Sequence, residues 1–234
     1  MTAENPTEDE HIEQLLEEMF EKNFERLKYE SGHGLAPEVK RNAFQQVLLY
    51  WRKLREIAET ITDTEVKLNL ANQITPRGHK FGIEGVVDIV REQARTVMYD
   101  IKTHDLEAVW ANLESYERQL NVYAYIWKNL RGESLDETDV IVTQLPVALQ
   151  QALELNDHEG VTREMLAWNP VVPIQFDKNR VDETIHAFGE VVDDIEQGCF
   201  EPPDPQRLGQ KDGRTETFAT RVCLNCDARF ACNS

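Results

Sequence analysis

Three charged residues in the middle of the chain have the types and the spacing of a divalent-cation site. Asp88 follows Gly85-Val86-Val87, and Asp100 and Lys102 come next, two residues apart. Carboxylate oxygens are hard ligands that suit Mg²⁺ or Mn²⁺. An ammonium group beside the cation offsets the negative charge that grows on a phosphate when water attacks it. These side chains therefore predict metal-assisted hydrolysis of a phosphate ester.

Two predicted strands position these groups. The segments Phe81–Arg91 and Thr96–Thr103 are rich in Val, Ile and Tyr. Residues Glu92–Arg95 between them can turn the chain, which predicts a β-hairpin. If the hairpin forms, Asp88 lies across it from Asp100, and the two carboxylates can bind one cation.

Strand periodicity predicts which way each side chain points. Because successive side chains alternate between the two faces of a strand, Asp100 and Lys102 project from one face. Ile101 between them is expected to point the opposite way, into the core. Gly85 lies inside the first strand, where glycine marks a bulge or a close approach of another backbone or a ligand.

A long helix is predicted after the hairpin, at about Asp105–Leu130. Its apolar residues recur at helical spacing, namely at Val109, Leu113, Tyr116, Leu120, Tyr123 and Ile126. Gln119 and Tyr123 are four residues apart and share one face, from which they can reach a phosphate or a base beside the cation. Tyr123 taken alone is also a typical core residue.

The order of these motifs resembles the PD-(D/E)XK nuclease superfamily, in the RecB-like branch that includes AddB-type nucleases and the CRISPR-associated RecB-like exonucleases. The shared pattern is a glycine-containing strand that ends in Asp, then Asp-x-Lys, then Gln-x-x-x-Tyr on the next helix. The resemblance implies that the catalytic residues are Asp88, Asp100, Lys102, Gln119 and Tyr123. It also implies that Asp88 and Asp100 hold Mg²⁺ or Mn²⁺.

Two further site residues follow from the resemblance. Many family members have a Glu at the start of the first strand, where this chain has Glu65. The family also tends to place a metal-binding His on an early helix, and His11 matches that helical context better than His33, which lies in a predicted loop. For Glu65 and for both histidines, a solvent-exposed surface residue is the alternative interpretation.

The resemblance implies a divalent-metal-dependent DNA nuclease that hydrolyses phosphodiester bonds with metal-activated water. We expect an exonuclease acting on single strands or duplex ends, with a helicase or within a complex for DNA repair, recombination or phage/CRISPR-type defence. Three alternatives stay open. They are a catalytically inactive adaptor with the nuclease fold, a zinc-stapled interaction module, and an RNA-directed nuclease.

The C-terminus carries a second possible metal site. Cys223, Cys226 and Cys232 form a C-x₂-C-x₅-C pattern, whose thiolates can converge on one soft metal or cluster. Some RecB-like nucleases have this ending together with an N-terminal cysteine, and the four cysteines hold a [4Fe-4S] cluster. No cysteine precedes Cys199 here, so the fourth ligand is Cys199, a His, or absent. Zinc is the alternative to the cluster, and a buried hydrophobic role is the alternative for Cys199.

Net charge argues against an ordinary DNA-binding surface. The chain has 25 basic and 43 acidic residues, a formal charge of −18, where non-specific DNA binders are basic. The acidic residues cluster in Glu8–Glu21, Glu133–Asp139 and Asp182–Glu196, which leaves room for a local basic channel. Candidates for it are Arg55, Lys80, Arg91, Lys102, Arg118 and Lys128. A partner protein that supplies the cations, or adaptation to a salty cytoplasm, also accounts for the charge.

We expect a cytoplasmic protein that does not associate with membranes. Residues Met1–Glu10 are polar and acidic, and no run approaches the roughly 18 apolar residues that span a bilayer. Three cysteines close together at the C-terminus fit a metal site in a reducing compartment better than a disulfide framework.

The predicted fold is α/β, with a restriction-endonuclease-like core in the order helix, three strands, helix, strand, preceded by extra N-terminal helices and followed by a Cys-containing tail. The predicted division is 1–62 for the helical region, 63–198 for the nuclease core and 199–234 for the tail, which begins with the proline-rich linker Glu201–Pro205. The other predicted helices are Glu8–Tyr29, Pro37–Thr62 and Asn179–Gly198. The other predicted strands are Glu65–Ala71, Asp139–Leu145 and Val171–Phe176, with an acidic connection over Gln150–Glu164 between the last two.

Overall fold

The computed structural model describes residues 8–34, 36–199, 204–211 and 217–226. The chain divides into two compact units, the first formed by residues 1–70 and 83–182 and the second by residues 71–82 and 183–234. The N-terminal helices thus belong to the same unit as most of the sheet. The second unit combines the tip of the β1–β2 hairpin with the C-terminal part of the chain. This partition differs from the division expected from the sequence.

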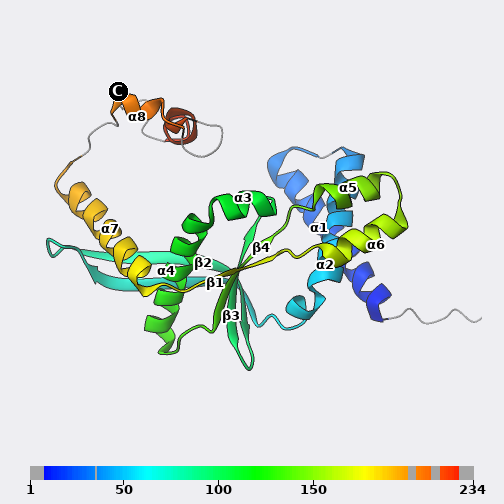
Figure 1. The fold of residues 1–234 in the computed structure, drawn as a ribbon, viewed down its shortest axis with the longest axis horizontal. Helices are drawn as coiled ribbons and strands as arrows, with labels where there is room; N and C mark the ends of the chain where they lie inside the picture. The colour runs from blue at the N-terminus through cyan, green and yellow to red at the C-terminus, as the bar shows by residue number, and fades with distance from the viewer. Residues whose placement is uncertain (1–7, 35, 200–203, 212–216, 227–234) are drawn as a thin grey trace, which may run out of the picture. The chain divides into compact units, whose positions relative to one another are not determined.

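The described elements alternate between helices and strands (Figure 1). The helices are α1 (Glu8–Ser31), α2 (Pro37–Ala58), α3 (Leu106–Ala111), α4 (Leu113–Arg131), α5 (Val147–Glu154), α6 (His158–Ala167), α7 (Lys178–Glu196), α8 (Pro205–Leu208) and the π-helical turn η1 (Ala219–Cys223). The strands are β1 (Asp63–Ile74), β2 (Lys80–Glu92), β3 (Thr96–Lys102), β4 (Glu137–Val142) and β5 (Val171–Ile174). None of the described helices is long and apolar enough to cross a membrane.

The five strands form one mixed sheet in the order β1-β2-β3-β4-β5. β2 and β3 are antiparallel, with Ile89 opposite Tyr99, and β4 and β5 are also antiparallel. β3 and β4 are parallel and are linked by α3 and α4. This is the mixed α/β arrangement of a restriction-endonuclease-like core, as predicted.

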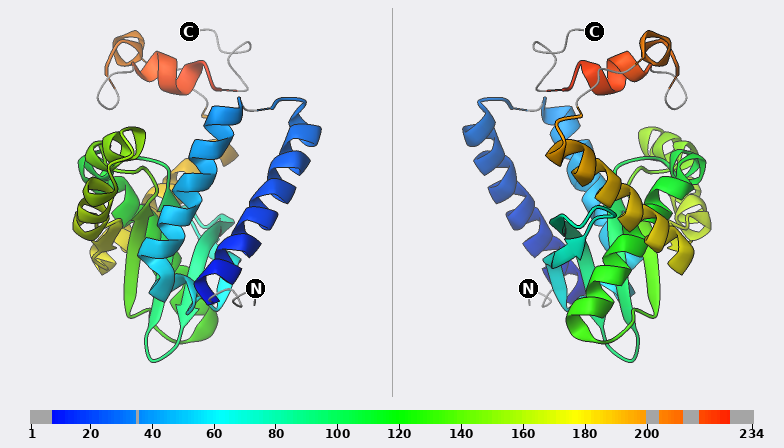
Figure 2. Two further views of the ribbon diagram at one scale, coloured as in Figure 1. Left: turned by 90° about the vertical axis from the view of Figure 1, so that its right-hand side faces the viewer. Right: turned by 90° about the vertical axis from the view of Figure 1, so that its left-hand side faces the viewer.

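Helices pack on both faces of the sheet in the first unit (Figure 2). On one face, Leu54 and Ile57 of α2 pack against a buried cluster that includes Tyr99. On the other face, Leu120 of α4 packs against a cluster that includes Val140. Because side chains alternate along β3, the positions next to Tyr99 face α4, and this is the face of Asp100 and Lys102.

Ile101 points to the face opposite Asp100 and Lys102, as predicted, but its predicted burial in the core is wrong, because the residue is 40% exposed. The β2–β3 pairing ends at Ile89 and Tyr99, two residues before this position. The α2 side chains pack over the earlier part of β3, at Val97 and Tyr99. Ile101 therefore lies on the α2 face but beyond the cluster that α2 covers.

The predicted helix over residues 105–130 is two helices in the structure. Asn112 between them has φ −118° and ψ 20°, and its side-chain amide donates to the carbonyl oxygen of Ala108 at 2.8 Å. Asparagine readily makes such local bonds in place of helical ones, which explains the break. Asp105 caps the first helix by accepting from the Ala108 N–H at 2.6 Å, and Gly132, with φ 77°, ends the second.

The segment between β4 and β5, predicted as an acidic connection, folds as two helices, α5 and α6. Figure 1 shows this helical pair beside α2. Leu149 and Trp168 form a buried cluster with Leu49 of α2, and the ring of Tyr50 meets that of Trp168 edge-on at 5.1 Å. The acidic residues lie on the solvent-facing side of the two helices. Because each apolar face contains only a few residues, the sequence pattern did not predict the helices.

In the second unit, α7 holds the turn between β1 and β2 through one buried carboxylate. Asp193 accepts hydrogen bonds from Thr75 Oγ1 at 2.5 Å and from the Arg77 N–H at 3.1 Å, and His79 Nδ1 lies 2.7 Å away. Burial opposes the ionised form, but the bonds from Thr75, His79 and Arg77 outweigh it and hold the pKa of Asp193 below its ordinary value. This residue therefore ties the hairpin tip to α7.

Asp139 lies on the α2 face of the sheet, and the pH dependence of stability tests whether its carboxyl group is buried there. Burial raises the pKa of this carboxyl to about 6, with a smaller contribution from Glu137 against the opposing effect of Arg91. The folded state thus binds a proton that the unfolded chain has already lost, so stability falls as the pH rises from about 4 to about 6. We expect Asp139→Asn to remove this loss, and its stability advantage over the parent to grow by about 2 kcal/mol across that range.

Urea unfolding of both proteins at pH 4, 5, 6 and 7 measures this difference. The matched control is Asp182→Asn, at an exposed position, whose difference from the parent should be flat. A flat difference for Asp139→Asn as well would contradict the prediction.

Candidate active site

The structure brings Asp88, Asp100 and Lys102 together where the pairing of β2 with β3 ends. Asp88 Oδ2 accepts a hydrogen bond from the backbone N–H of Ile101 at 2.6 Å. This bond holds the Asp88 side chain against β3, next to Asp100. Lys102 Nζ lies 2.6 Å from Asp100 Oδ2. The sequence expectation that the two carboxylates meet across the hairpin agrees with this geometry.

Asp100 is the most buried of the three residues. The residue is only 3% exposed, and burial raises the pKa of its carboxyl, with Lys102 acting in the opposite direction and Asp88 adding to the rise. Although Lys102 Nζ is close, its direction is not that of a hydrogen bond, and buried Oδ2 has no hydrogen-bond partner among the described residues. A buried carboxylate oxygen with an ion pair but no hydrogen bond is incompletely stabilised, and a bound cation would add the missing interaction.

The donor set fits a divalent cation of the Mg²⁺ type. Asp88 and Asp100 provide the carboxylates, and within the described residues no third His, Cys, Asp or Glu completes a cluster with them. Mg²⁺ is commonly held by one or two carboxylates and keeps its remaining positions for water and substrate phosphate oxygens. Asp88 and Asp100 are therefore the residues that would hold the ion.

Lys102 is positioned by an aromatic residue of α4. Its Nζ lies 5.5 Å from the ring centroid of Tyr116, a cation–π contact. The Tyr116 hydroxyl in turn lies 3.3 Å from His104 Nδ1. The sequence predicts Tyr116 only as part of the apolar face of the helix, and it does not indicate His104 as a site residue. The available signal was the spacing, because Tyr116 lies one helical turn before Gln119.

Gln119 and Tyr123 share one helix face, as predicted. Gln119 Nε2 donates to the Tyr123 hydroxyl at 3.0 Å. The Tyr123 ring lies against Gly85, where an added Cβ would be 2.4 Å from Tyr123 Cε1. The group that approaches Gly85 closely is therefore a side-chain ring, where the sequence predicted a bulge, another backbone or a ligand. A role of the pair in binding substrate stays a prediction.

Comparison with known proteins identifies the family of the chain. A model described as the PD-(D/E)XK nuclease superfamily matches residues 2–233. The chain belongs to this superfamily. Membership implies a nuclease that hydrolyses phosphodiester bonds with divalent metals such as Mg²⁺ or Mn²⁺. The Asp88, Asp100 and Lys102 geometry is consistent with that chemistry.

Seven chains of solved structures also match. One is the crystal structure of SSO0001, with a TM-score of 0.40 and 13% sequence identity, covering 93% of this chain and 96% of that chain. At these values the likeness carries no further conclusion. No curated protein matches.

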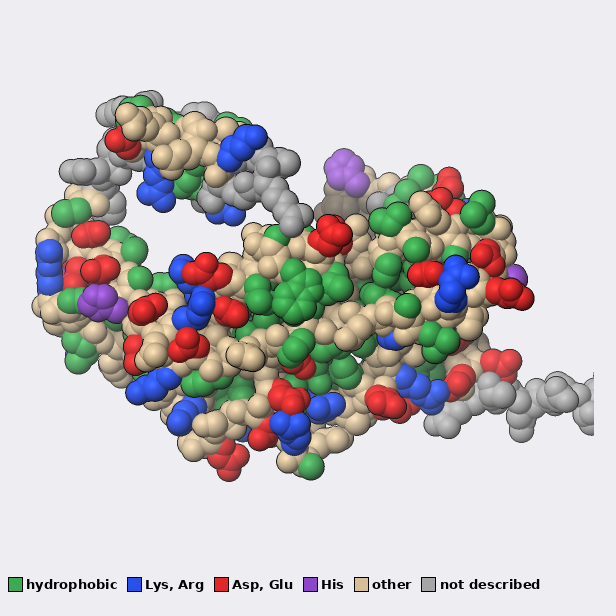
Figure 3. All heavy atoms as spheres, viewed as in Figure 1, with side chains coloured by type: hydrophobic (Ala, Val, Ile, Leu, Met, Phe, Trp, Pro, Cys, Tyr) green, Lys and Arg blue, Asp and Glu red, His purple; other side chains and the backbone are tan. Residues whose placement is uncertain are grey.

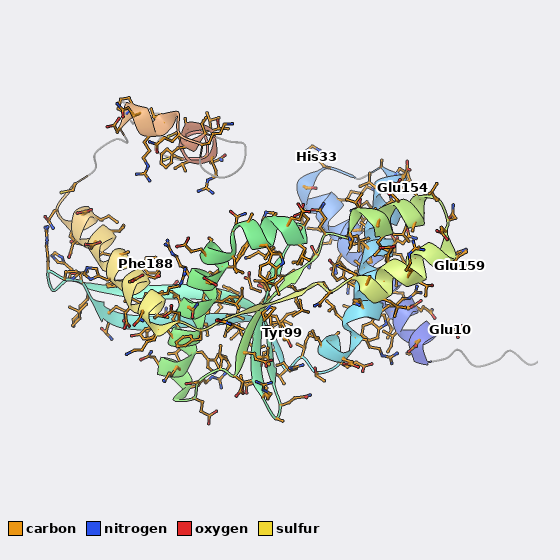
Figure 4. All side chains as sticks on the ribbon, in the orientation of Figure 1. Glu10, His33, Tyr99, Glu154, Glu159 and Phe188 are labelled. Carbon is orange, nitrogen blue, oxygen red and sulfur yellow. The ribbon has the colours of Figure 1, made fainter. Side chains whose placement is uncertain are left out.

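Other residues expected at the site of this superfamily member lie elsewhere. Glu65 is an exposed residue of β1 with φ 53°, in the left-handed region. His11 is exposed near the start of α1, and His33 is exposed in the loop after α1 (Figure 4). Within the described residues, none of these joins Asp88 and Asp100 in a metal-binding cluster. Their roles stay predictions without a geometric basis.

Among the described residues, several candidates for the basic channel already have partners of their own. Arg55 is ion-paired with Asp9 and Glu59, and Arg118 with Glu114 at 2.7 Å. Of the other candidates, Arg91 lies over the Tyr99 ring, and Lys80 and Lys128 lie on β2 and α4. Figure 3 shows Lys and Arg side chains interspersed with Asp and Glu on the face in view.

The cysteines lie in the second unit. Cys223 and Cys226 lie at the two ends of one turn, which the Cys226 N–H closes by donating to the Cys223 carbonyl oxygen at 3.3 Å. Cys199, just after α7, is exposed. Cys232 lies outside the described residues. The three described thiols are free, and no metal-binding group of three is present among the described residues.

Proposed function

We propose that this superfamily member is a RecB-like DNA nuclease that depends on Mg²⁺ or Mn²⁺ and works as an exonuclease. The observation that carries the proposal is the buried carboxylate of Asp100, which lies beside Asp88 and whose Oδ2 has an ion pair with Lys102 but no hydrogen bond among the described residues. The motif order of the RecB-like branch supports it, since Gln119 and Tyr123 follow on α4 and are hydrogen-bonded to each other.

The chemistry divides among these residues. A divalent ion held by Asp88 and Asp100 would supply Lewis acidity and a more acidic water. The Lys102 ammonium, fixed over Tyr116, offsets negative charge on the phosphate and orients the attacking water. The paired side chains of Gln119 and Tyr123 position the phosphate or a neighbouring base.

The net negative charge bears on how DNA reaches the proposed active site. With a formal charge of −18, the chain gains little from non-specific attraction to DNA, so a partner such as a helicase or a repair, recombination or defence complex delivers single strands or duplex ends to the site. Free thiols fit the reducing cytoplasm as the proposed location.

A cleavage assay tests the proposal. Labelled single-stranded DNA, duplex DNA and RNA are incubated with the protein and Mg²⁺, Mn²⁺ or EDTA. We expect shortening of DNA from its ends with either metal, none in EDTA, and none with Asp88→Ala or Asp100→Ala. If both variants cleaved DNA as fast as the parent protein, these residues would not form the active site. DNA binding without cleavage would indicate the adaptor, and cleavage confined to RNA would indicate the RNA-directed alternative.

We further propose that Cys223, Cys226 and Cys232 bind a [4Fe-4S] cluster with Cys199 as the fourth ligand, in the manner of the RecB-like relatives. The C-x₂-C spacing across one turn supports it, because both thiols can reach one metal. Zinc is the second candidate, since it accepts the same ligands.

Protein purified without oxygen should be brown, with broad absorbance near roughly 400 nm, and Cys199→Ser should bleach it. The matched control is Ser234→Ala, which should keep the colour. Colourless protein with about one zinc per chain would indicate a structural zinc site instead. Metal-free protein whose melting temperature is unchanged when all four cysteines are serine would contradict both.

A further inference from the structure

A cavity of about 250 Å³ lies beside the end of β4, between α2, α5 and the segment that joins β4 to α5. All of its walls belong to the first unit. The residues that line it are Asn42, Gln45, Gln46, Gln144, Leu145, Gln150, Leu153 and Glu154. Figure 4 shows Glu154 on α5.

The lining is chemically unusual because it is dominated by neutral amides. Of the eight described residues that line the cavity, five are Asn or Gln, one is Glu, two are Leu, and none is Lys or Arg. A side-chain amide both donates and accepts hydrogen bonds, which matches the mixed donor and acceptor edges of a nucleobase. A phosphate requires cations or several N–H donors, so a lining of this kind favours a base over a phosphate. The leucines provide apolar contact for the flat ring.

Part of the lining is held in place by the fold. The Gln46 amide donates to the carbonyl oxygen of Thr143, and Gln150 Nε2 donates to that of Leu145 at 2.7 Å. These bonds fix the two side chains and leave their amide oxygens as acceptors. Gln45 and Gln144 are exposed, and neither side chain forms a hydrogen bond with another described residue. They are therefore available to a ligand.

The cavity is connected to the catalytic strand through backbone hydrogen bonds. Lys102 and Val142 are partners at the end of the β3–β4 ladder. The Thr143 N–H donates to the Lys102 carbonyl oxygen at 2.8 Å, and the Thr143 carbonyl accepts from Gln46. The Lys102 side chain points to the α4 face, whereas the cavity lies toward α2. A DNA strand that crosses this end of the sheet can therefore meet both.

We propose that this cavity binds one unpaired base of the DNA strand whose phosphate is cleaved at Asp88, Asp100 and Lys102. The inference rests on the proposed function and narrows it to substrates with a single-stranded segment at the site. A base within a duplex presents a paired edge and cannot enter, whereas an unpaired base offers its whole edge to the amides.

An abasic scan tests the proposal by binding alone. Fluorescence anisotropy in EDTA measures the affinity for a labelled single-stranded 12-mer and for versions that each lack one base. We expect one position at which removal of the base weakens binding about tenfold. The double variant Gln45→Ala/Gln144→Ala should bind the intact 12-mer about tenfold more weakly and be insensitive to removal of that base. Gln151→Ala, an exposed neighbour outside the lining, is the matched control and should behave like the parent.

The outcomes separate the two proposals. A parent protein that cleaves DNA but shows no base-dependent position, or a double variant with parental affinity and a parental scan, would overturn the base site and leave the nuclease intact. A base-dependent position that the double variant loses, in a protein that cleaves nothing with Mg²⁺ or Mn²⁺, would support the base site and remove the nuclease. No binding of the parent to any 12-mer would overturn the base site.

Discussion

Lys102→Ala is expected to slow DNA cleavage by about 10²–10³-fold while Mn²⁺ still binds. The ammonium lies 2.6 Å from Asp100 Oδ2 and over the Tyr116 ring, so it is fixed beside the cleavage site but is not a metal ligand. Its removal takes away stabilisation of charge that develops in the transition state. Single-turnover cleavage gives the rate, and calorimetry with Mn²⁺ gives the affinity.

Asp100→Ala should behave differently, because it removes a ligand. Both cleavage and Mn²⁺ affinity should be lost. Its folded state should be no less stable than the parent without metal, since the parent buries a carboxylate whose pKa is already raised by burial. Lys102→Ala should be less stable than the parent, because it leaves that carboxylate without its counter-charge.

Lys22→Ala is the matched control for charge, since Lys22 is an exposed residue of α1. It should keep both cleavage and metal affinity. Parental cleavage by Lys102→Ala would rule out its role. If Lys102→Ala instead lost Mn²⁺ affinity as completely as Asp100→Ala, the separation between metal binding and charge stabilisation would be wrong.

Local periodicity accounts for what the sequence predicted at the site. A hairpin puts Asp88 opposite Asp100 when the turn is short, and the alternation of a strand puts Asp100 and Lys102 on one face. A helix puts Gln119 beside Tyr123 for the same geometric reason. All three relations are between residues close in sequence, and the structure shows each of them.

Long-range packing accounts for what the sequence did not predict. Whether Ile101 is covered depends on where α2 packs across the sheet, and α2 is more than 40 residues earlier in the chain. The apolar side chains of α5 and α6 are buried by packing with Leu49 of α2. Because the two helices are short and acidic, their sequences alone predicted helix only weakly. The roles of Glu65 and His11 came from resemblance alone, and the described geometry does not bring them to the carboxylates.

Gly85→Ala is expected to cost about 1–3 kcal/mol of stability and to reduce cleavage as well. The added Cβ would lie 2.4 Å from Tyr123 Cε1, 3.1 Å from Cδ1 and 3.2 Å from Cζ, so the ring has to move. The ring is held by α4 and by the bond from Gln119 to its hydroxyl, and a shift breaks that bond. The substitution therefore couples a strand position to the proposed substrate-binding pair.

A double-mutant cycle separates this clash from an ordinary loss of glycine. In the Tyr123→Ala background the ring is gone, so Gly85→Ala should then cost little, and the two changes should be strongly non-additive in urea unfolding. Gly209→Ala is the control, since a Cβ there meets nothing within 4 Å and its φ of −85° suits any residue. Additive costs would show that Gly85 is needed by the backbone of β2, and that its contact with Tyr123 does not position the helix for catalysis.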